Sequence, residues 1–390
     1  MCHKKTDVKR LEPYKLAKLM INPAQYIQKI FVTEECAELP YTRRITERAG
    51  LPVEIIKERR LPGFNSGDQY HFQLTNGKRN LLLCRNQGHF FKPCPGTREY
   101  QCCEYQVINI GMNCPMDCVY CILQAYLNNP WLTFFVNIDD LLTELEEAVN
   151  EAGPERFWRI GTGEFTDSMA LDKWTGLSEI LTGFTARHPN TILELKTKSA
   201  IIDNLADLDH QGRTITAWSL NSPEIMEKEE LRTATLDERL AAAAQCARWG
   251  YKLAFHFDPI IYHADWRAGY AETIKRLFAA VPADQIAWIS MGALRFLPGL
   301  RQITADRFPR SRFMAEEFIM GLDGKCRYFR DLRVEMYKYI YKLLRREADR
   351  RTCIYFCMES DEIWQEVMGF RPADKGGLPA MLEQTVQRGA

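Results

Sequence analysis

The feature that most limits how this chain folds is a regular alternation of short apolar runs with longer amphipathic segments, which begins near Tyr105. Short apolar runs bounded by turn residues are typical of buried strands. Strand–helix alternation implies a parallel sheet with right-handed crossovers, and five or six such units favour a partial barrel. We therefore expect an α/β fold, a partial (β/α)6 barrel with its chemistry at the carboxyl ends of the strands. The predicted strands are residues 105–110, 134–138, 156–161, 191–196, 214–220, 251–257 and 285–291.

Two segments between these strands carry clear helix signals. Residues 138–153 follow Asn137, a residue type common at helix N-caps, and have apolar side chains at helical spacing. A second helix ends at Gly250, where a left-handed C-terminal cap is expected. The alternation also divides the chain into three predicted parts. These are an N-terminal extension (1–104), the barrel (105–312) and a C-terminal extension with a basic helix and a short strand (313–390).

The composition is that of an ordinary globular protein. Hydrophobic residues make up 46%, charged residues 26%, and the net charge is +0, so no global field draws the chain to a polyanion. No run approaches the ~20 apolar residues of a membrane span, and the N-terminus lacks a signal-peptide core. We expect a cytoplasmic protein with no membrane partner. In that compartment, clusters among its 13 cysteines indicate metal binding or catalysis rather than disulfides.

Three cysteines follow the first predicted barrel strand at the spacing C-x3-C-x2-C: Cys114, Cys118 and Cys121. Three thiolates in such a loop bind three irons of a 4Fe–4S cluster and leave the fourth iron open. An open iron chelates S-adenosylmethionine, and one electron, from a donor such as flavodoxin or ferredoxin, then yields a 5′-deoxyadenosyl radical that abstracts hydrogen. A zinc site would need a fourth nearby ligand, and a redox dithiol would be C-x2-C alone. The motif predicts a radical S-adenosylmethionine enzyme.

Polar residues at later strand ends are candidate contacts to that cofactor. Gly163 allows close backbone approach, and the carboxylate of Glu164 suits the cofactor's ammonium group. Lys198, after the next strand, suits its carboxylate, while Ser219 and Asn221 suit its ribose hydroxyls. Each of these residues alone is equally typical of a solvated loop. Their positions at successive strand ends indicate a cofactor site.

The chain resembles the spore photoproduct lyase family, radical enzymes that split the methylene-bridged thymine dimer of ultraviolet-damaged spore DNA. The resemblance implies a (β/α)6 partial barrel, cluster ligation by the three cysteines, and Glu164, Lys198 and Ser219 near S-adenosylmethionine. It also implies a lyase that repairs a thymine-dimer lesion in DNA. The segments that carry the resemblance are residues 30–45, 111–124, 134–141, 197–205, 218–222, 239–270 and 294–312.

Two positions depart from the family's pattern. The lyases have a hydrogen-donor cysteine after the strand that here ends at Gly161, and a relay tyrosine where this chain has Ile122. Tyr120 is retained, and we predict that it is catalytic. Because glycine cannot donate a hydrogen atom, either another residue quenches the radical or the chain catalyses a different reaction on a related scaffold.

Four cysteines outside the motif are candidates for a second function. Cys94, Cys102 and Cys103 precede the barrel, and Cys357 lies near the C-terminus. Their chemistry suits a second iron–sulfur cluster or a zinc site. Cys357 is also a candidate catalytic residue, as a thiol that replaces the missing donor. Buried, unreactive cysteines are the remaining interpretation.

Basic residues near the C-terminus predict a local patch for DNA phosphates. Tyr337 and Tyr341 lie among them, although the alternation with acidic residues equally suits a solvated helix. Two other functions stay open. One is a radical enzyme acting on a peptide, nucleoside or small molecule, which Gly161 and Ile122 favour; the other is a metal-stabilised nucleic-acid-binding protein without catalysis. The basic residues are Arg301, Arg307, Arg310, Arg312, Arg330, Arg333, Lys338, Lys342, Arg345 and Arg346.

Overall fold

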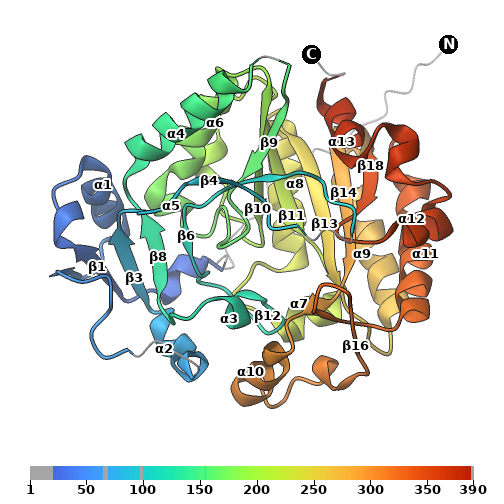
Figure 1. Ribbon diagram of the computed structural model, residues 1–390, viewed down its shortest axis with the longest axis horizontal. Helices are drawn as coiled ribbons and strands as arrows, with labels where there is room; N and C mark the ends of the chain where they lie inside the picture. Colours follow the sequence, from blue (N-terminus) through green and yellow to red (C-terminus); the bar gives the residue numbers. More distant parts are fainter. Residues whose placement is uncertain (1–20, 65–68, 97–99, 154, 388–390) are drawn as a thin grey trace, which may run out of the picture.

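The computed structural model describes residues 21–64, 69–96, 100–153 and 155–387, and a curled eight-stranded sheet forms its centre (Figure 1). The strand order is β18-β14-β13-β11-β10-β9-β5-β4. All neighbours pair in parallel except β4, which pairs antiparallel with β5. The predicted α/β half-barrel is therefore confirmed. The strands are β4 (Phe91–Pro93), β5 (Gln106–Ile108), β9 (Trp158–Gly161), β10 (Thr191–Thr197), β11 (Thr214–Ser219), β13 (Lys252–Ile260), β14 (Ile286–Ala293) and β18 (Cys353–Phe356).

Helices cover the outer face of this sheet. Helix α6 (Leu177–Ala186) packs on β10 and β11, and α8 (Leu236–Arg248) packs on β11 and β13, with α9 (Trp266–Ala280) beside α8. Helix α8 begins with a capping box between Thr235 and Glu238, and Gly250 follows it at φ 88°. This φ confirms the predicted left-handed residue. Glycine suits the position because a residue with a side chain rarely adopts that φ.

A second, five-stranded sheet lies beside the half-barrel, with the order β2-β1-β3-β8-β6. The predicted barrel strand 134–138 is β8, and it belongs to this second sheet. The apolar strand β3 supplies a parallel partner for it, and Ile138 already begins helix α4 after the N-cap Asn137. The strands are β1 (Lys29–Thr33), β2 (Val53–Ile56), β3 (Asn80–Cys84), β6 (Gly111–Met112) and β8 (Leu132–Phe135).

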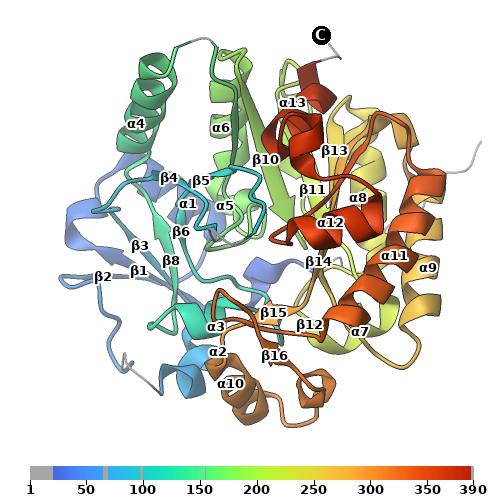
Figure 2. The same ribbon diagram turned by 45° about the vertical axis from the view of Figure 1, so that its right-hand side comes forward.

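The C-terminal segment completes the barrel instead. The short apolar strand predicted there is β18, which pairs with β14, and α11, α12 and α13 lie nearby (Figure 2). The eight-stranded sheet therefore runs across both predicted boundaries, at 104/105 and 312/313, and the five-stranded sheet runs across the first. The three-part division stays a prediction. The other helices are α1 (Pro40–Ala49), α2 (Leu74–Gly77), α3 (Leu123–Tyr126), α4 (Ile138–Glu151), α5 (Asp172–Thr175), α7 (Pro223–Glu229), α10 (Gly299–Arg307), α11 (Arg330–Glu347), α12 (Asp361–Met368) and α13 (Leu378–Gln387).

Two small antiparallel sheets border the carboxyl ends of the barrel strands. In one, β7 (Asp117–Cys118) pairs with β12 (Glu230–Leu231). In the other, β17 (Cys326–Arg327) lies between β15 (Arg295–Phe296) and β16 (Ile319–Met320). Within the described ranges, none of the helices has the length and apolar content needed to cross a membrane.

Candidate active site

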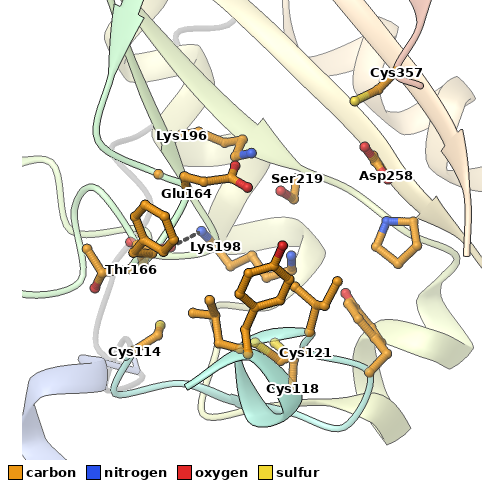
Figure 3. Close-up of a pocket in the computed structure, with 18 of the residues that line it drawn as sticks. Cys114, Cys118, Cys121, Glu164, Thr166, Lys196, Lys198, Ser219, Asp258 and Cys357 are labelled. Carbon is orange, nitrogen blue, oxygen red and sulfur yellow. Dashed lines mark hydrogen bonds between the residues drawn. The ribbon is translucent and has the colours of Figure 1, made fainter. Parts of the chain in front are cut away.

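A cavity of about 320 Å³ opens at the carboxyl ends of the barrel strands. Residues at the ends of β9, β10, β11, β13, β14 and β18 line it, together with the loop that carries the three-cysteine motif. This is the position that a parallel half-barrel offers for catalysis, because its strands all direct their carboxyl ends to one side. Figure 3 shows the motif cysteines at one end of the cavity and Cys357 at the other.

The three motif cysteines all line the cavity. Cys118 lies in β7, opposite Glu230 of β12, so a strand pair fixes its backbone. Asn113 adopts a left-handed φ of 71°, and its Oδ1 accepts a hydrogen bond of 3.0 Å from the backbone N–H of Cys114. A strand pair and a side-chain hydrogen bond thus position the backbone of two of the three motif cysteines.

A buried group of charged side chains, called the ion cluster below, supports this loop. Asp117, inside the motif, accepts hydrogen bonds from Lys78 Nζ at 3.0 Å and from Arg307 Nη2 at 2.9 Å. Burial disfavours the charged carboxylate, but these two cations outweigh burial and lower the pKa of Asp117 to about 2. Arg307 was predicted to bind DNA phosphates, and here its guanidinium instead anchors the cluster loop.

The residues present fit a 4Fe–4S cluster. All three thiols are free and reach one cavity, and Lys78 and Lys198 provide positive charge near Cys114 and Cys118 respectively. Among the described residues, no group of three or more His, Cys, Asp or Glu converges as one metal ion requires. A cubane does not require such convergence, because each thiolate binds a different iron.

The predicted cofactor contacts lie between the two ends of the cavity, except for one. Gly163, Glu164, Lys198 and Ser219 line it (Figure 3). Asn221 is not among the lining residues. Its side chain is buried, donates to the carbonyl of Pro259 at 2.8 Å, and accepts from the hydroxyl of Tyr270 at 2.6 Å. Its amide is thus used to join β11 to β13, so the structure does not support Asn221 as a cofactor contact.

Asp167 fixes the loop that presents Gly163 and Glu164, and no sequence pattern predicted this role. Its carboxylate accepts from the backbone N–H of Lys198 at 2.9 Å and from the Thr197 hydroxyl at 2.7 Å. A Cβ on Gly163 would come within 3.3 Å of the Lys196 and Ser168 side chains. The absence of a side chain at Gly163 therefore lets the loop lie close to β10.

The end of the cavity opposite the cluster cysteines carries several charges. Arg295 pairs with Asp258 through both carboxylate oxygens at 3.2 Å, and Lys196 and Lys325 also line the wall. Arg295 additionally donates from Nη2 to the sulfur of Cys357 at 3.3 Å. Of these residues, the sequence predicted only Cys357 as a site residue. The others form a cluster only when the ends of separate strands come together in the fold.

The two positions that depart from the family pattern have different surroundings. Ile122 lines the cavity, as does Tyr120, whose hydroxyl donates to Glu230. Gly161 is the last residue of β9 and is not among the lining residues. A Cβ there would lie 1.7 Å from the Tyr105 hydroxyl. The packing of Tyr105 therefore requires glycine at position 161. Gly163 is the first residue after β9 that lines the cavity.

Three of the four additional cysteines line two different cavities, and Cys102 lines neither of the two. Cys94 and Cys357 line the main cavity, whereas Cys103 lines a separate one of about 230 Å³. A hydrogen bond from Cys102 and the nearby Arg159 lower the pKa of Cys103 to about 5, against the effect of burial. Within the described residues, these cysteines likewise do not belong to any group of three or more ligands that could hold one zinc ion. A second iron–sulfur cluster stays a prediction.

The predicted basic face of α11 is largely neutralised within the protein. Arg330 and Lys338 pair with Glu366, and Arg333 is buried and donates to a main-chain carbonyl. Tyr337 is fully buried and donates to Glu359 at 2.7 Å. Arg333 and Tyr337 are therefore not available to phosphates, and phosphate contacts by the exposed residues of this helix stay a prediction. Of the other predicted positions, Arg301, Arg310, Arg312, Lys342 and Arg346 are exposed, Arg345 is partly buried against main-chain carbonyls, and Tyr341 packs on the core.

Comparison with known proteins identifies the family. The sequence model described as spore photoproduct lyase matches residues 30–361, which is most of the chain. The chain belongs to the spore photoproduct lyase family. It is 25% identical over 325 residues to the spore photoproduct lyase of Bacillus subtilis, covering 81% of this chain and 90% of that protein. It is 27% identical over 270 residues to a Geobacillus spore photoproduct lyase, covering 68% and 75%.

Solved structures of the family share the fold. A spore photoproduct lyase variant with bound AdoMet and dinucleoside spore photoproduct superposes with a TM-score of 0.75, at 22% identity, over 84% of this chain and 98% of that one. The enzyme complexed with dinucleoside spore photoproduct gives a TM-score of 0.74 over 85% and 98%. The half-barrel predicted from strand–helix alternation is thus the fold of this enzyme family.

Proposed function

We propose that this chain is a radical S-adenosylmethionine lyase that splits the spore photoproduct in DNA. The observation that carries the proposal is a single cavity with the three motif cysteines at one end, cofactor-type contacts along its middle, and a charged wall at the other. Relatives of similar length are spore photoproduct lyases, and two of the solved family structures hold dinucleoside spore photoproduct.

In this proposal Cys114, Cys118 and Cys121 hold a 4Fe–4S cluster. Bound S-adenosylmethionine, after one-electron reduction, supplies the 5′-deoxyadenosyl radical for hydrogen abstraction. Glu164 holds the cofactor's ammonium group and Lys198 its carboxylate, since both side chains line the cavity beside the cluster loop.

Ser219 and Tyr120 complete the cofactor side of the cavity in this proposal. Ser219 binds a ribose hydroxyl, and its backbone carbonyl is fixed by Arg239 Nη1 at 2.7 Å. Tyr120 lies with its ring under Lys198, whose Nζ is 5.6 Å from the ring centroid, and its hydroxyl is held by Glu230. Tyr120 therefore closes the cavity floor between the cluster and the substrate.

DNA would approach over the hairpin formed by β16 and β17. Arg295 of β15 and Lys325, beside β17, line the cavity, so this small sheet connects the cavity with the surface. At the other side of the hairpin, Met320 is 60% exposed and Leu322 is 82% exposed. Exposed apolar side chains beside a pocket suit unstacked bases, and the exposed Arg310 and Arg312 suit phosphates.

The proposal includes a one-electron donor of the flavodoxin or ferredoxin class and a cytoplasmic location. Clustered cysteines in a reducing compartment serve metal binding or catalysis rather than disulfides, which is the role this proposal gives them. A radical enzyme with a different substrate is the second candidate. It is favoured by one sequence fact: there is no cysteine between Cys121 and Cys246, so the loop after β9 offers no thiol.

The test is an anaerobic assay of reduced, cluster-loaded protein with S-adenosylmethionine and dinucleotide spore photoproduct. Repair predicts that thymidylyl-thymidine and 5′-deoxyadenosine both form, and that Cys118→Ala abolishes both. Lys198→Met should instead raise the Kd for S-adenosylmethionine, with Lys173→Met on α5 as the matched control. Formation of 5′-deoxyadenosine without repair would assign the radical chemistry to another substrate.

A further inference from the structure

The main cavity contains two thiols that are not in the cluster motif, those of Cys94 and Cys357. Any radical that remains after the two thymines separate needs one hydrogen atom to become the product. The loop between Gly161 and Asp167 cannot supply it from a thiol, because it contains no cysteine. A thiol donor must therefore stand on another element of the cavity wall.

Cys357 follows the last barrel strand, β18, and is held from two sides. Its backbone N–H donates to the carbonyl of Met291 at 2.9 Å, which continues the pairing with β14. Its sulfur accepts a hydrogen bond from Arg295 at 3.3 Å, and Asp258 clamps that guanidinium. Figure 3 shows its thiol above Asp258, at the end of the cavity away from the cluster cysteines.

This arrangement leaves the S–H bond available. Because Arg295 donates to a lone pair of the sulfur, the hydrogen of the thiol is not used in that contact. Burial raises the pKa of Cys357 well above that of a free thiol, so the group keeps its hydrogen at neutral pH. Burial raises the pKa of Cys94 as well, but within the described residues no side-chain hydrogen bond to its sulfur matches that from Arg295 to Cys357.

We propose that Cys357 is the hydrogen-atom donor that quenches the product radical in this chain; the proposal rests on the lyase function above. The S–H bond of Cys357 breaks and a C–H bond forms at the thymine-derived carbon, so the substrate radical is reduced and the thiol becomes a thiyl radical. One electron from the low-potential donor that also reduces the cluster, with one proton from solvent, restores the thiol. Each repaired lesion then consumes one S-adenosylmethionine and two electrons.

The test uses exchange of the thiol hydrogen with solvent. In D2O, wild-type protein should place one deuterium in each repaired thymine pair and form one 5′-deoxyadenosine per lesion. Cys357→Ala and Cys357→Ser should lower the yield of deuterated product by about tenfold or more, while 5′-deoxyadenosine still forms. Cys353→Ala is the matched control, since Cys353 lies on β18, just before Cys357, but is not among the residues lining the cavity.

A second readout is independent of turnover. Hydroxyl-radical oxidation of the cluster-loaded protein, which does not require the thiolate, is read by mass spectrometry and should show protection of Cys357 when dinucleotide spore photoproduct is bound. Equal iron content in wild type and Cys357→Ala establishes that the variant keeps its cluster.

The outcomes separate this inference from the function on which it rests. Unchanged solvent deuterium in both Cys357 variants, loss of deuterium in Cys94→Ala instead, or no protection under saturating dinucleotide would each overturn the assignment while the lyase function stands. Fewer 5′-deoxyadenosine molecules than repaired lesions would overturn the proposed return of the thiyl radical to the thiol. Wild-type protein that releases no thymine pair would overturn both proposals.

Discussion

Arg239 of α8 donates a hydrogen bond of 2.5 Å from Nη2 to Oε2 of Glu230, and both side chains are fully buried. Glu230 also accepts from the Tyr120 hydroxyl, inside the cluster motif, and its strand β12 pairs with Cys118. The same guanidinium donates to the carbonyl of Ser219. One arginine from an outer helix thus joins the cluster loop to the cofactor side of the cavity.

Replacing Arg239 by methionine should destabilise the protein by about 3–5 kcal/mol, because the carboxylate of Glu230 would stay buried without its cation. Urea unfolding measures the loss. Arg248→Met on the same helix is the matched control, since Arg248 is exposed and donates to the side chain of Gln245. Equal stabilities of the two variants would contradict the role given to this pair.

Asp117→Asn should weaken the support of the cluster loop. Lys78 and Arg307 would keep their buried positive charges without a carboxylate between them, which also costs about 3–5 kcal/mol. We expect faster loss of iron to a chelator than in wild type. Asp139→Asn, at an exposed position of α4, should release iron at the wild-type rate; a similar rate in both variants would show that the ion cluster does not support the loop.

The sequence predicted what is local in the chain and missed what depends on distant partners. The three cysteines lie within eight residues, so their spacing alone indicated a cluster. Asp117 lies among them, but its partners Lys78 and Arg307 are 39 and 190 positions away. No periodicity links such residues before the fold is known.

The same limit explains two errors of placement. Residues 134–138 have the composition of a barrel strand, and only the presence of β3 as a neighbour assigns them to the second sheet. Asn221 follows a barrel strand like the true lining residues, but Tyr270 and Pro259 occupy its amide. Apolar pattern and position at a strand end predicted the fold and the cavity positions of most candidate residues, whose roles stay predictions. Hydrogen-bond partners from other strands decided the exceptions.

The interior of the barrel makes stability depend on pH through Glu194. Burial raises the pKa of this carboxyl, but the contact with His256 Nε2 at 2.7 Å and nearby cations outweigh it and lower the pKa from 4.5 to about 2. The unfolded chain therefore binds the proton more readily. The contribution of Glu194 to stability is complete above pH 4.5 and is lost as the pH falls toward 2.

Urea unfolding at a series of acidic pH values should show this loss in wild type and a smaller pH dependence in Glu194→Gln. Glu147→Gln, exposed on α4, should keep the wild-type pH profile. A Glu194→Gln profile parallel to that of wild type would contradict the assignment.

Gly161 should tolerate no side chain. A Cβ would lie 1.7 Å from the Tyr105 hydroxyl and 2.5 Å from the carbonyl oxygen of Glu194, so Gly161→Ala should cost about 1–3 kcal/mol or more through overpacking. Gly299→Ala, where a Cβ meets open space, is the control. Gly161→Cys should likewise lower the melting temperature, and a variant as stable as wild type would show that the packing of Tyr105 can adjust.

The central claim, that radical chemistry in this cavity acts on the DNA lesion, is tested most directly by following a label from the lesion. Dinucleotide spore photoproduct carrying deuterium at all carbon-bound positions of its two bases would be supplied to reduced, cluster-loaded protein with unlabelled S-adenosylmethionine. The account predicts deuterium in the 5′-deoxyadenosine formed, together with released thymidylyl-thymidine. Unlabelled 5′-deoxyadenosine would contradict it, because the hydrogen would then have come from something other than the lesion.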